Sequence, residues 1–401
     1  MVNSQLQTRT PMLNIRTYGV LLVTLLSRQA QATDLLVAPC GGGNVHPTIT
    51  SALQAANPGD RILIEPATYP GDHIITKSVT LLSNSPTERF VIDGALHVGL
   101  PAGPHTVVLC SMWLTGDLDD WFQDHAASGS LRVVDCVVEG RVICVNPEDL
   151  HYTLQRDSIL STVHLRNAAI IGCHLTGTHS QSDLGTLFQM FGGATGAGSL
   201  RMIGNVIGAA SANAAARIHV DPRVPFEIRN NLFLAPQGTL TGPLVYVGTT
   251  SPMTNVTRVF ENNTAYRTGG GAPVLLYVKD HPSQLIMSVR NNHIVGNWQA
   301  FDIEPSEVVP EYNVVTTSTS SLDPLTGQPT PGSTALNAGD PDASFLDLDL
   351  SRNDAGCYGG SYSRDNYDDP MPSSAVVLFM DVPRRTQTGQ TLFIKADGFD
   401  R

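Results

Sequence analysis

Charge of either sign is scarce in this sequence, and positive charge is the scarcer. Only 15% of the 401 residues are charged, with 24 Lys and Arg against 36 Asp and Glu, and the formal net charge is -12. No run rich in Lys or Arg is present, so the electrostatic footprint of a nucleic-acid-binding protein is missing. We therefore exclude nucleic acid as a partner.

Long apolar runs are also missing. No segment reaches the roughly 18 apolar residues that a transmembrane helix needs. The N-terminus instead has Arg9 and Arg16, a short apolar run at 20–26, and an Ala-Gln-Ala sequence ending at Ala32. This order is typical of an export signal, and an ordinary N-terminal strand is the alternative. We predict a signal peptide over 1–32 and a secreted protein.

Cysteine patterns that would define a metal site are absent as well. The six cysteines contain no CxxC pair, and their even number permits disulfides in an exported chain. Three of them, Cys110, Cys136 and Cys173, belong to the repeat described next, in which side chains stack inside a core. We therefore expect these three to be buried thiols.

What the sequence does contain is an internal repeat. Short β-like runs recur along the chain, each interrupted by Cys or Asn, at a mean interval of 29 residues. That interval is the length of one solenoid coil built of short strands and turns, whereas Asn pairs that only mark loops would not stay in phase. The repeated positions are Cys110, Cys136, Cys173, Asn205, Asn231, Asn263, Asn292 and Asn313.

A ladder of this kind has a physical reason. Equivalent residues of neighbouring coils lie about 4.8 Å apart, and an Asn at a bend can adopt the left-handed conformation while its amide bonds to the Asn of the next coil. A second strand follows each rung, with an outward residue between two apolar ones. These strands are 143–145, 188–190, 218–220, 245–247, 276–278 and 301–303.

The two ends of the chain complete the predicted architecture. A first strand at 34–39 precedes an amphipathic helix at 46–57, which would cover the open edge of the first coil. We predict an all-β fold, a right-handed parallel β-helix with a short N-terminal capping helix, over 33–360. A polar, Pro-rich linker follows at 361–374, and 375–401 is a β-rich tail or the start of another module.

Five sequence segments carry a resemblance to a known family. Residues 49–64, with Tyr69-Pro-Gly and 75–81, look like the N-terminal cap and first coil of pectin lyase-like right-handed parallel β-helix proteins. Residues 336–342 and 352–360 resemble the closing segment of secreted bacterial members. The resemblance implies this fold and, in the enzymes, a groove on the outside of one sheet. It does not imply one function, because the fold hosts lyases, hydrolases, epimerases and non-catalytic proteins.

If the chain follows that pattern, its site is the outward face of the second strand. The first outward row has Cys144, Gln189, His219, Tyr246, Tyr277 and Asp302, and the next has Asn146, Phe191, Asp221, Gly248, Lys279 and Glu304, with Arg217 beside His219. Tyrosines beside ionic groups suit a sugar-binding surface, although Tyr is also favoured on solvated sheets. We predict a substrate-binding set of Tyr246, Tyr277, Gln189, Asp302 and Glu304.

Spacing discriminates between reactions. Asp221 and Glu304 are three coils apart, about 14 Å, which is too far for a glycosidase pair, whereas Asp302 and Glu304, about 6.6 Å apart, fit an inverting pair. A lyase acting on a uronate polysaccharide needs a cation for the carboxylate and a base for the ring proton. The predicted catalytic set is His219 as base, Asp221 orienting it, and Arg217 or Lys279 as the cation.

Two alternatives stay open. No catalytic signature is recognisable, so a non-catalytic extracellular protein that binds glycans, adheres or is structural is the second class. Calcium is the one cofactor considered, because acidic clusters suit this hard cation, yet turn-forming Asp is the simpler explanation and EF-hand spacing is absent. The clusters are Asp117, Asp119, Asp120 and Asp124, and Asp340, Asp342, Asp347, Asp349 and Asp354.

Overall fold

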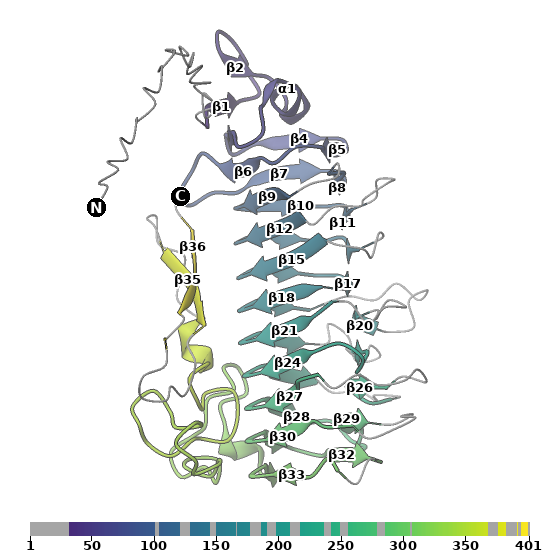
Figure 1. Ribbon diagram of the computed structural model, residues 1–401, viewed down its shortest axis with the longest axis vertical. Helices are drawn as coiled ribbons and strands as arrows, with labels where there is room; N and C mark the ends of the chain where they lie inside the picture. The colour runs from purple at the N-terminus through teal and green to yellow at the C-terminus, as the bar shows by residue number, and fades with distance from the viewer. Residues whose placement is uncertain are drawn as a thin grey trace, which may run out of the picture. The chain divides into compact units, whose positions relative to one another are not determined.

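The computed structural model describes most of the chain after residue 31 (Figure 1). The predicted export signal, apart from Ala32, lies outside the described residues. For strands β20 (Thr186–Met190) and β35 (Val376–Asp381), and for Arg217, only the backbone is described. The described residues are 32–100, 104–120, 129–144, 150–165, 167–176, 186–190, 198–208, 217–235, 242–248, 256–278, 285–304, 307–367, 376–381, 391 and 394–399.

Three long sheets make up the domain, and we call them A, B and C. In spatial order, sheet A contains β2 (Val45–His46), β1 (Asp34–Val37), β3 (Arg61–Ile64), β6 (Thr80–Ser83), β9 (His105–Cys110), β12 (Gly129–Val134), β15 (Leu150–Gln155), β18 (Ala168–Ile171), β21 (Leu200–Ile203), β24 (Phe226–Arg229), β27 (Arg258–Glu261), β30 (Ser288–Arg290) and β33 (Pro310–Glu311). Sheet B contains β4 (Thr68–Pro70), β7 (Phe90–Asp93), β10 (Met112–Leu114), β13 (Val137–Val138), β16 (Ser158–Ile159), β19 (His174–Leu175), β22 (Val206–Gly208), β25 (Leu232–Ala235), β28 (Thr264–Arg267), β31 (His293–Val295) and β34 (Val314–Thr316). Sheet C contains β5 (His73–Ile75), β8 (Leu96–Val98), β11 (Leu118–Asp119), β14 (Val142–Ile143), β17 (Val163–Leu165), β20, β23 (Arg217–Val220), β26 (Val245–Val247), β29 (Val274–Val278) and β32 (Gln299–Ile303).

The chain visits the three sheets in the same order in every coil. After β3 it passes from sheet A to B to C and returns to A one strand further along, and all pairs within these sheets are parallel (Figure 1). This is a right-handed parallel β-helix, so the predicted fold class is confirmed. Only short strands are needed, because each strand gains backbone partners from the coils before and after it.

Alternation along the strands builds the core. In β3, for example, Ile62 and Ile64 are fully buried, while Arg61 and Leu63 point outward and are half-buried. The inward residues of all three sheets form one continuous apolar cluster from Val37 to Val308. Each fully buried Ile or Leu stabilises the fold by about 1.5–3 kcal/mol relative to exposure, so this stacked interior is the main stabilising element.

The first predicted rung of the ladder is wrong. Cys110 pairs with Val134 at the end of sheet A, and the residue equivalent to Cys136 is Met112, since Trp113 pairs with Val137. Cys110 points outward and is buried there in a small separate apolar cluster. The rung at this coil is therefore apolar, and a sequence search for Cys or Asn selected the wrong position.

The interval of 37 residues between Cys136 and Cys173 contains two coils. Register in sheet B makes Asp157 the intervening rung, because Ser158 pairs with Val137 on one side and with His174 on the other. Asp157 is fully buried, and its carboxylate accepts the backbone N–H groups of Cys136 and Gln155 at 2.8 and 2.9 Å. Desolvation raises its pKa well above the ordinary value, although these hydrogen bonds oppose the shift.

From Asn205 to Asn313 the rungs form an amide ladder. The side-chain N–H of each Asn donates to Oδ1 of the next, through Asn231, Asn263 and Asn292, at 2.8–3.1 Å. The same oxygens also accept the backbone N–H of the preceding rung. The predicted stacking is thus confirmed, and each buried amide is satisfied on both sides.

The left-handed residue at this bend is a different one from the rung. It is the residue just before, for example Asn230 with φ 54°, Asn262 with φ 52° and Asn291 with φ 59°. The sequence prediction assigned both roles to one Asn. Two adjacent residues share them because the left-handed residue turns the chain and points its own side chain outward, while the next side chain points into the ladder.

The predicted capping helix is confirmed as α1 (Ile49–Ala55), whose buried face contains Ile49, Ala52 and Leu53. Thr48 begins the helix with a capping box shared with Ser51. Among the described residues no helix is long and apolar enough to cross a membrane.

After the last coil, a closing segment (residues 319–367) returns along the outside of the solenoid. It has little regular structure beyond η1 (Thr319–Ser321) and η2 (Arg364–Asn366). The left-handed Asn row receives it: the amide of Asn230 donates to the carbonyls of Cys357 and Gly359 at 3.1 and 2.6 Å. Further on, Tyr367 packs on Ile171 and Ile203, so residues predicted as the start of a linker contact the β-helix.

The remaining tail contains β35 and β36 (Lys395–Phe399), which pair as an antiparallel hairpin. All six cysteines are free thiols, and those predicted to be buried, Cys110, Cys136 and Cys173, are buried.

Candidate functional site

One row of outward positions runs along the whole of sheet C, and at Gln189 only the backbone is described. Most members lie between two inward apolar residues, as His219 lies between the fully buried Ile218 and Val220. Because the registers are continuous, consecutive members are about 4.8 Å apart. In spatial order, the row is Ile74, His97, Asp119, Ile143, His164, Gln189, His219, Tyr246, Tyr277 and Asp302.

Five residues predicted for this row are therefore brought together in order: Gln189, His219, Tyr246, Tyr277 and Asp302. The sixth, Cys144, is not a member, because Val142 is the inward residue of β14 and Ile143 occupies the row. The predicted strand 143–145 is shifted by one residue from the observed β14. The coil at 150–165, which the repeat does not include, adds His164 to the row, in the apolar-polar-apolar sequence Val163-His-Leu165.

At the centre of the C-terminal half of the row, three rings contact one another. The rings of Tyr246 and Tyr277 form an offset stack with centroids 5.6 Å apart, and the His219 ring meets Tyr246 edge-on at 4.8 Å. Tyr246 leans along its own strand over Gly248, where any Cβ would lie 2.5 Å from the phenol oxygen. Each tyrosine therefore partly covers one face of the other ring.

The His219 imidazole is held in a defined state. Burial lowers its pKa, and this effect exceeds the opposing attraction of Asp221 and a hydrogen bond to the backbone of Gly248. At neutral pH the ring is therefore uncharged.

Asp221, predicted to orient His219, has a different principal partner. The guanidinium of Arg223 donates to both carboxylate oxygens of Asp221, including contacts of 2.9 and 3.0 Å, and the Arg223 backbone N–H donates to Oδ1 at 2.9 Å. Asp221 is nearly buried and closes a local turn after β23. Strand alternation alone does not reveal this pairing, because both residues belong to the turn.

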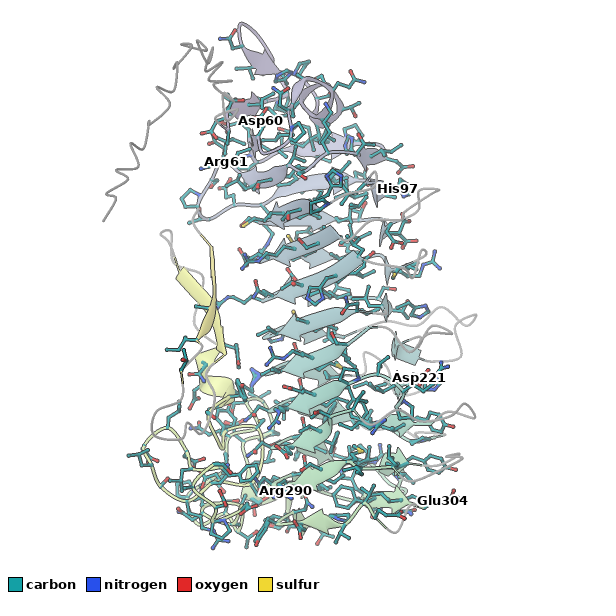
Figure 2. All side chains as sticks on the ribbon, viewed as in Figure 1. Asp60, Arg61, His97, Asp221, Arg290 and Glu304 are labelled. Carbon is teal, nitrogen blue, oxygen red and sulfur yellow. The ribbon has the colours of Figure 1, made fainter. Side chains whose placement is uncertain are left out.

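The cations predicted for a substrate carboxylate are only partly described. Arg217 begins β23 with its backbone alone described, and Lys279 lies outside the described residues. Glu304 follows β32 and is exposed, in the row that also contains Asp221. Figure 2 shows Asp221 and Glu304 along the same side of the coil stack as His97.

The N-terminal half of the row contains a His–Asp pair that sequence analysis missed. His97 and Asp119 are register partners on β8 and β11, and Nδ1 of His97 lies 2.7 Å from Oδ1 of Asp119. The His97 side chain is 20% exposed and that of Asp119 only 9%. The signal was present, since Leu96-His-Val98 and Leu118-Asp119 follow the alternation of the other strands, but the first coils were not aligned.

The acidic clusters do not converge on a metal-binding geometry. Among the described residues no group of three or more His, Cys, Asp or Glu side chains is placed to hold a metal ion. In the closing segment the carboxylates instead accept turn N–H groups, as Asp347 does from Gly360 and Asp354 from Asn337. Burial raises the pKa of Asp347 to about 6. Asp124 lies outside the described residues.

Comparisons with known proteins give structural similarity only. No family model matches the sequence, and no curated protein matches it. A solved pectate lyase, Pel9A, is 14% identical with a TM-score of 0.44 over 83% of this chain and 97% of its own. The alginate lyase AlyGC of polysaccharide lyase family 6 is 15% identical with a TM-score of 0.34, over 70% and 47% of the two chains. A mannuronic acid-specific family 6 lyase from human gut microbiota is 11% identical with a TM-score of 0.29, over 73% and 89%.

Proposed function

We propose that this protein is a secreted, glycan-engaging β-helix whose binding surface is the outer row of sheet C around His219, Tyr246 and Tyr277. The observation that carries the proposal is the contact of these three rings on the outer face of sheet C. The rings supply apolar contact and the phenol hydroxyls supply hydrogen-bonding groups. A sugar ring has both C–H surface and hydroxyl groups, so it matches this combination. Asp302, one coil further on, extends the polar surface.

Binding to immobilised acidic and neutral polysaccharides tests this proposal, with and without calcium. We expect retention on at least one acidic polysaccharide, and a loss of at least tenfold in affinity for Tyr246→Ala with Tyr277→Ala. The matched control is Tyr312→Ala, an exposed tyrosine at a bend after sheet A, outside sheet C. We call the surface around Tyr246 and Tyr277 the tyrosine surface. Equal retention of the double variant and the parent protein would rule out the tyrosine surface as the glycan-binding site.

A second candidate function is β-elimination on a uronate polysaccharide. The lowered pKa of His219 favours it, because an uncharged imidazole can accept a ring proton. Arg217 or Lys279 would supply the cation for the substrate carboxylate, and Asp221 acts on His219 only as a nearby negative charge. Non-catalytic glycan binding is the alternative, since binding requires the three rings but neither a base nor a cation.

Product analysis separates these two functions. The protein is incubated with each polysaccharide while unsaturated uronate absorbance and new reducing ends are followed together. A lyase gives both signals, and His219→Ala removes both, whereas His174→Ala on sheet B leaves them unchanged. A hydrolase gives reducing ends alone. Binding with neither signal over the whole panel identifies a non-catalytic protein.

Export has its own test. The full chain is expressed in a bacterial host, and the protein in the medium is analysed by mass spectrometry of its N-terminus. We expect cleavage after Ala32. Retention of residues 1–32 in an exclusively intracellular protein would overturn the assignment.

A further inference from the structure

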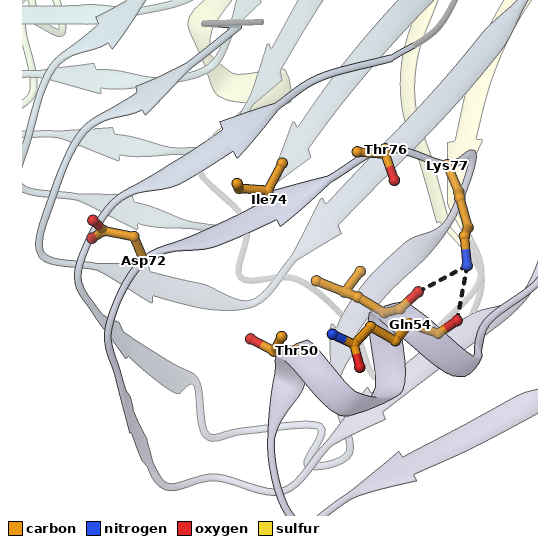
Figure 3. A pocket seen from close by; sticks show the side chains of 7 residues that line it. Thr50, Gln54, Asp72, Ile74, Thr76 and Lys77 are labelled. Carbon is orange, nitrogen blue, oxygen red and sulfur yellow. Dashed lines mark hydrogen bonds between the residues drawn. The ribbon is translucent and has the colours of Figure 1, made fainter.

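A pocket lies between the capping helix α1 and strand β5, at the first coil of sheet C (Figure 3). Its volume is about 450 Å³, within the range of small-molecule sites. Ile74 and Leu53 provide apolar surface, and polar side chains surround it. The lining residues are Thr50, Leu53, Gln54, Asp72, Ile74, Thr76 and Lys77.

The hydrogen-bonding state of the lining residues indicates what the pocket accepts. Within the described part of the chain, the Gln54 amide and the Thr76 hydroxyl make no hydrogen bond, although both belong to exposed residues facing the pocket. The Thr50 hydroxyl bonds to His73 at 3.0 Å. The pocket thus combines the Gln54 amide and the threonine hydroxyls with the apolar side chain of Ile74. This combination suits a ligand such as a sugar, in which hydroxyl groups alternate with C–H surface.

Charge argues against an anionic ligand. Lys77 is the one cation among the described lining residues, and its ammonium group donates to the carbonyls of Leu53, Gln54 and Ala56 at 3.1, 3.0 and 2.7 Å. An ammonium group has three protons, so these bonds use its full donor capacity at the end of the helix. Asp72 adds a negative charge, which would repel a carboxylate.

The pocket borders the His–Asp pair. Ile74, which lines the pocket, and His97 are register partners on neighbouring strands. Their backbones are therefore about one strand spacing, roughly 4.8 Å, apart. Nδ1 of His97 lies 2.7 Å from Oδ1 of Asp119, and this contact orients the imidazole ring at the edge of the pocket. A sugar hydroxyl can both donate and accept a hydrogen bond, so it is a suitable partner for an imidazole.

We propose that this pocket is a second carbohydrate-binding site, selective for a neutral sugar unit, and that Asp119 positions His97 to form a hydrogen bond with a sugar hydroxyl at the edge of the pocket. The inference rests on residues of its own, since seven strand spacings, about 34 Å, separate Ile74 from Tyr246 along the row. It therefore adds a site with the opposite charge preference to the tyrosine surface.

Calorimetry on the full chain tests the proposal with cellohexaose, mannohexaose, xylohexaose and galactohexaose, each alone, and with hexagalacturonate as the acidic comparator. We expect one neutral hexasaccharide to bind. Ile74→Trp, which fills the pocket from an exposed position, should remove this binding, and Gln54→Ala should weaken it three- to tenfold. Asp119→Asn should weaken it several-fold and His97→Ala at least as much, while His97→Gln, which keeps an acceptor, restores part of it.

Two further variants keep the outcomes distinct. Val315→Trp, an equally large substitution at an exposed residue of sheet B, should leave neutral binding unchanged, and Tyr246→Ala should leave it unchanged too. If Tyr246→Ala removes neutral binding while Ile74→Trp does not, the pocket inference fails and the tyrosine surface stands. The inference also fails if none of the four neutral hexasaccharides binds, or if hexagalacturonate binds and is displaced by Ile74→Trp.

Discussion

The two halves of the solenoid solve the same packing problem with different chemistry. In the N-terminal half the rungs at the bend between sheets A and B are apolar or thiol groups, such as Phe90, Met112 and Cys136, apart from the buried carboxyl of Asp157. In the C-terminal half they are amides, from Asn205 to Asn313, joined by hydrogen bonds. Apolar rungs fill volume without preferring one register, whereas amide rungs bond in a single register. Directional specificity is therefore concentrated in the half that also contains the tyrosine surface.

The largest predicted effect is on the unfolding free energy, and it comes from replacing an amide rung of the C-terminal half with an apolar residue like those of the N-terminal half. Asn263→Leu deletes a side chain that bonds to two neighbouring rungs and leaves buried amides and a backbone N–H unsatisfied. We expect a loss of about 3–5 kcal/mol in unfolding free energy by urea denaturation. Met112→Leu, a swap of similar volume at an apolar rung, should cost less than about 1.5 kcal/mol. Equal losses at the two rungs would contradict the comparison.

The closing segment provides the next test, because it covers coils of the C-terminal half. A Cβ on Gly204 would lie 2.2 Å from the Tyr367 ring, at a backbone φ of +69° that disfavours L residues. Gly204→Ala should therefore displace Tyr367 and cost about 2–4 kcal/mol in unfolding free energy. Gly208→Ala is the matched control, since its Cβ would meet only Thr176, at 3.7 Å. Thermal unfolding with limited proteolysis of the closing segment measures both.

Asp157, where the two halves meet, predicts a dependence on pH. Its folded-state pKa is raised by burial, so between the unfolded pKa near 4 and the raised value the unfolded chain releases a proton that the folded chain keeps. Stability from this group is fully present below about pH 4 and falls as pH rises, by at most about 1.4 kcal/mol per pH unit. Urea denaturation of Asp157→Asn should lack this slope. An identical slope in the variant would assign the effect to other groups.

The smallest predicted effect is on glycan affinity, and it separates the contribution of the Tyr246 hydroxyl from that of its ring. Tyr246→Phe keeps the stack with Tyr277 and removes one phenol hydroxyl, so we expect a two- to fivefold loss of glycan affinity, about 0.4–1 kcal/mol, with unchanged unfolding free energy. Tyr246→Ala should lose at least tenfold. Titration calorimetry on the two variants decides whether the ring or the hydroxyl dominates, and a larger loss for Phe than for Ala would exclude binding through the rings.

Sequence reasoning succeeded where a pattern is local and repeated. Alternation placed His219, Tyr246 and Tyr277 on one face, and the Asn positions gave the coil register downstream of Asn205. It failed where the rung is an apolar residue, because nothing in the sequence distinguishes Met112 as a rung from any other core residue of a β-strand. The pairing of His97 with Asp119 required the register of two early coils, and that of Asp221 with Arg223 required a turn geometry.

The left-handed Asn row has a consequence for how the molecule opens. Stability in a solenoid is a sum of nearest-neighbour terms, so an end coil can fray without disturbing the rest. The closing segment bonds to Asn230, Asn262 and Asn291 in three successive coils, so detaching the last of these coils also breaks contacts made by the other two. Amide hydrogen exchange in these coils should therefore occur in one cooperative step, and become graded from the end once those three outward amides are replaced.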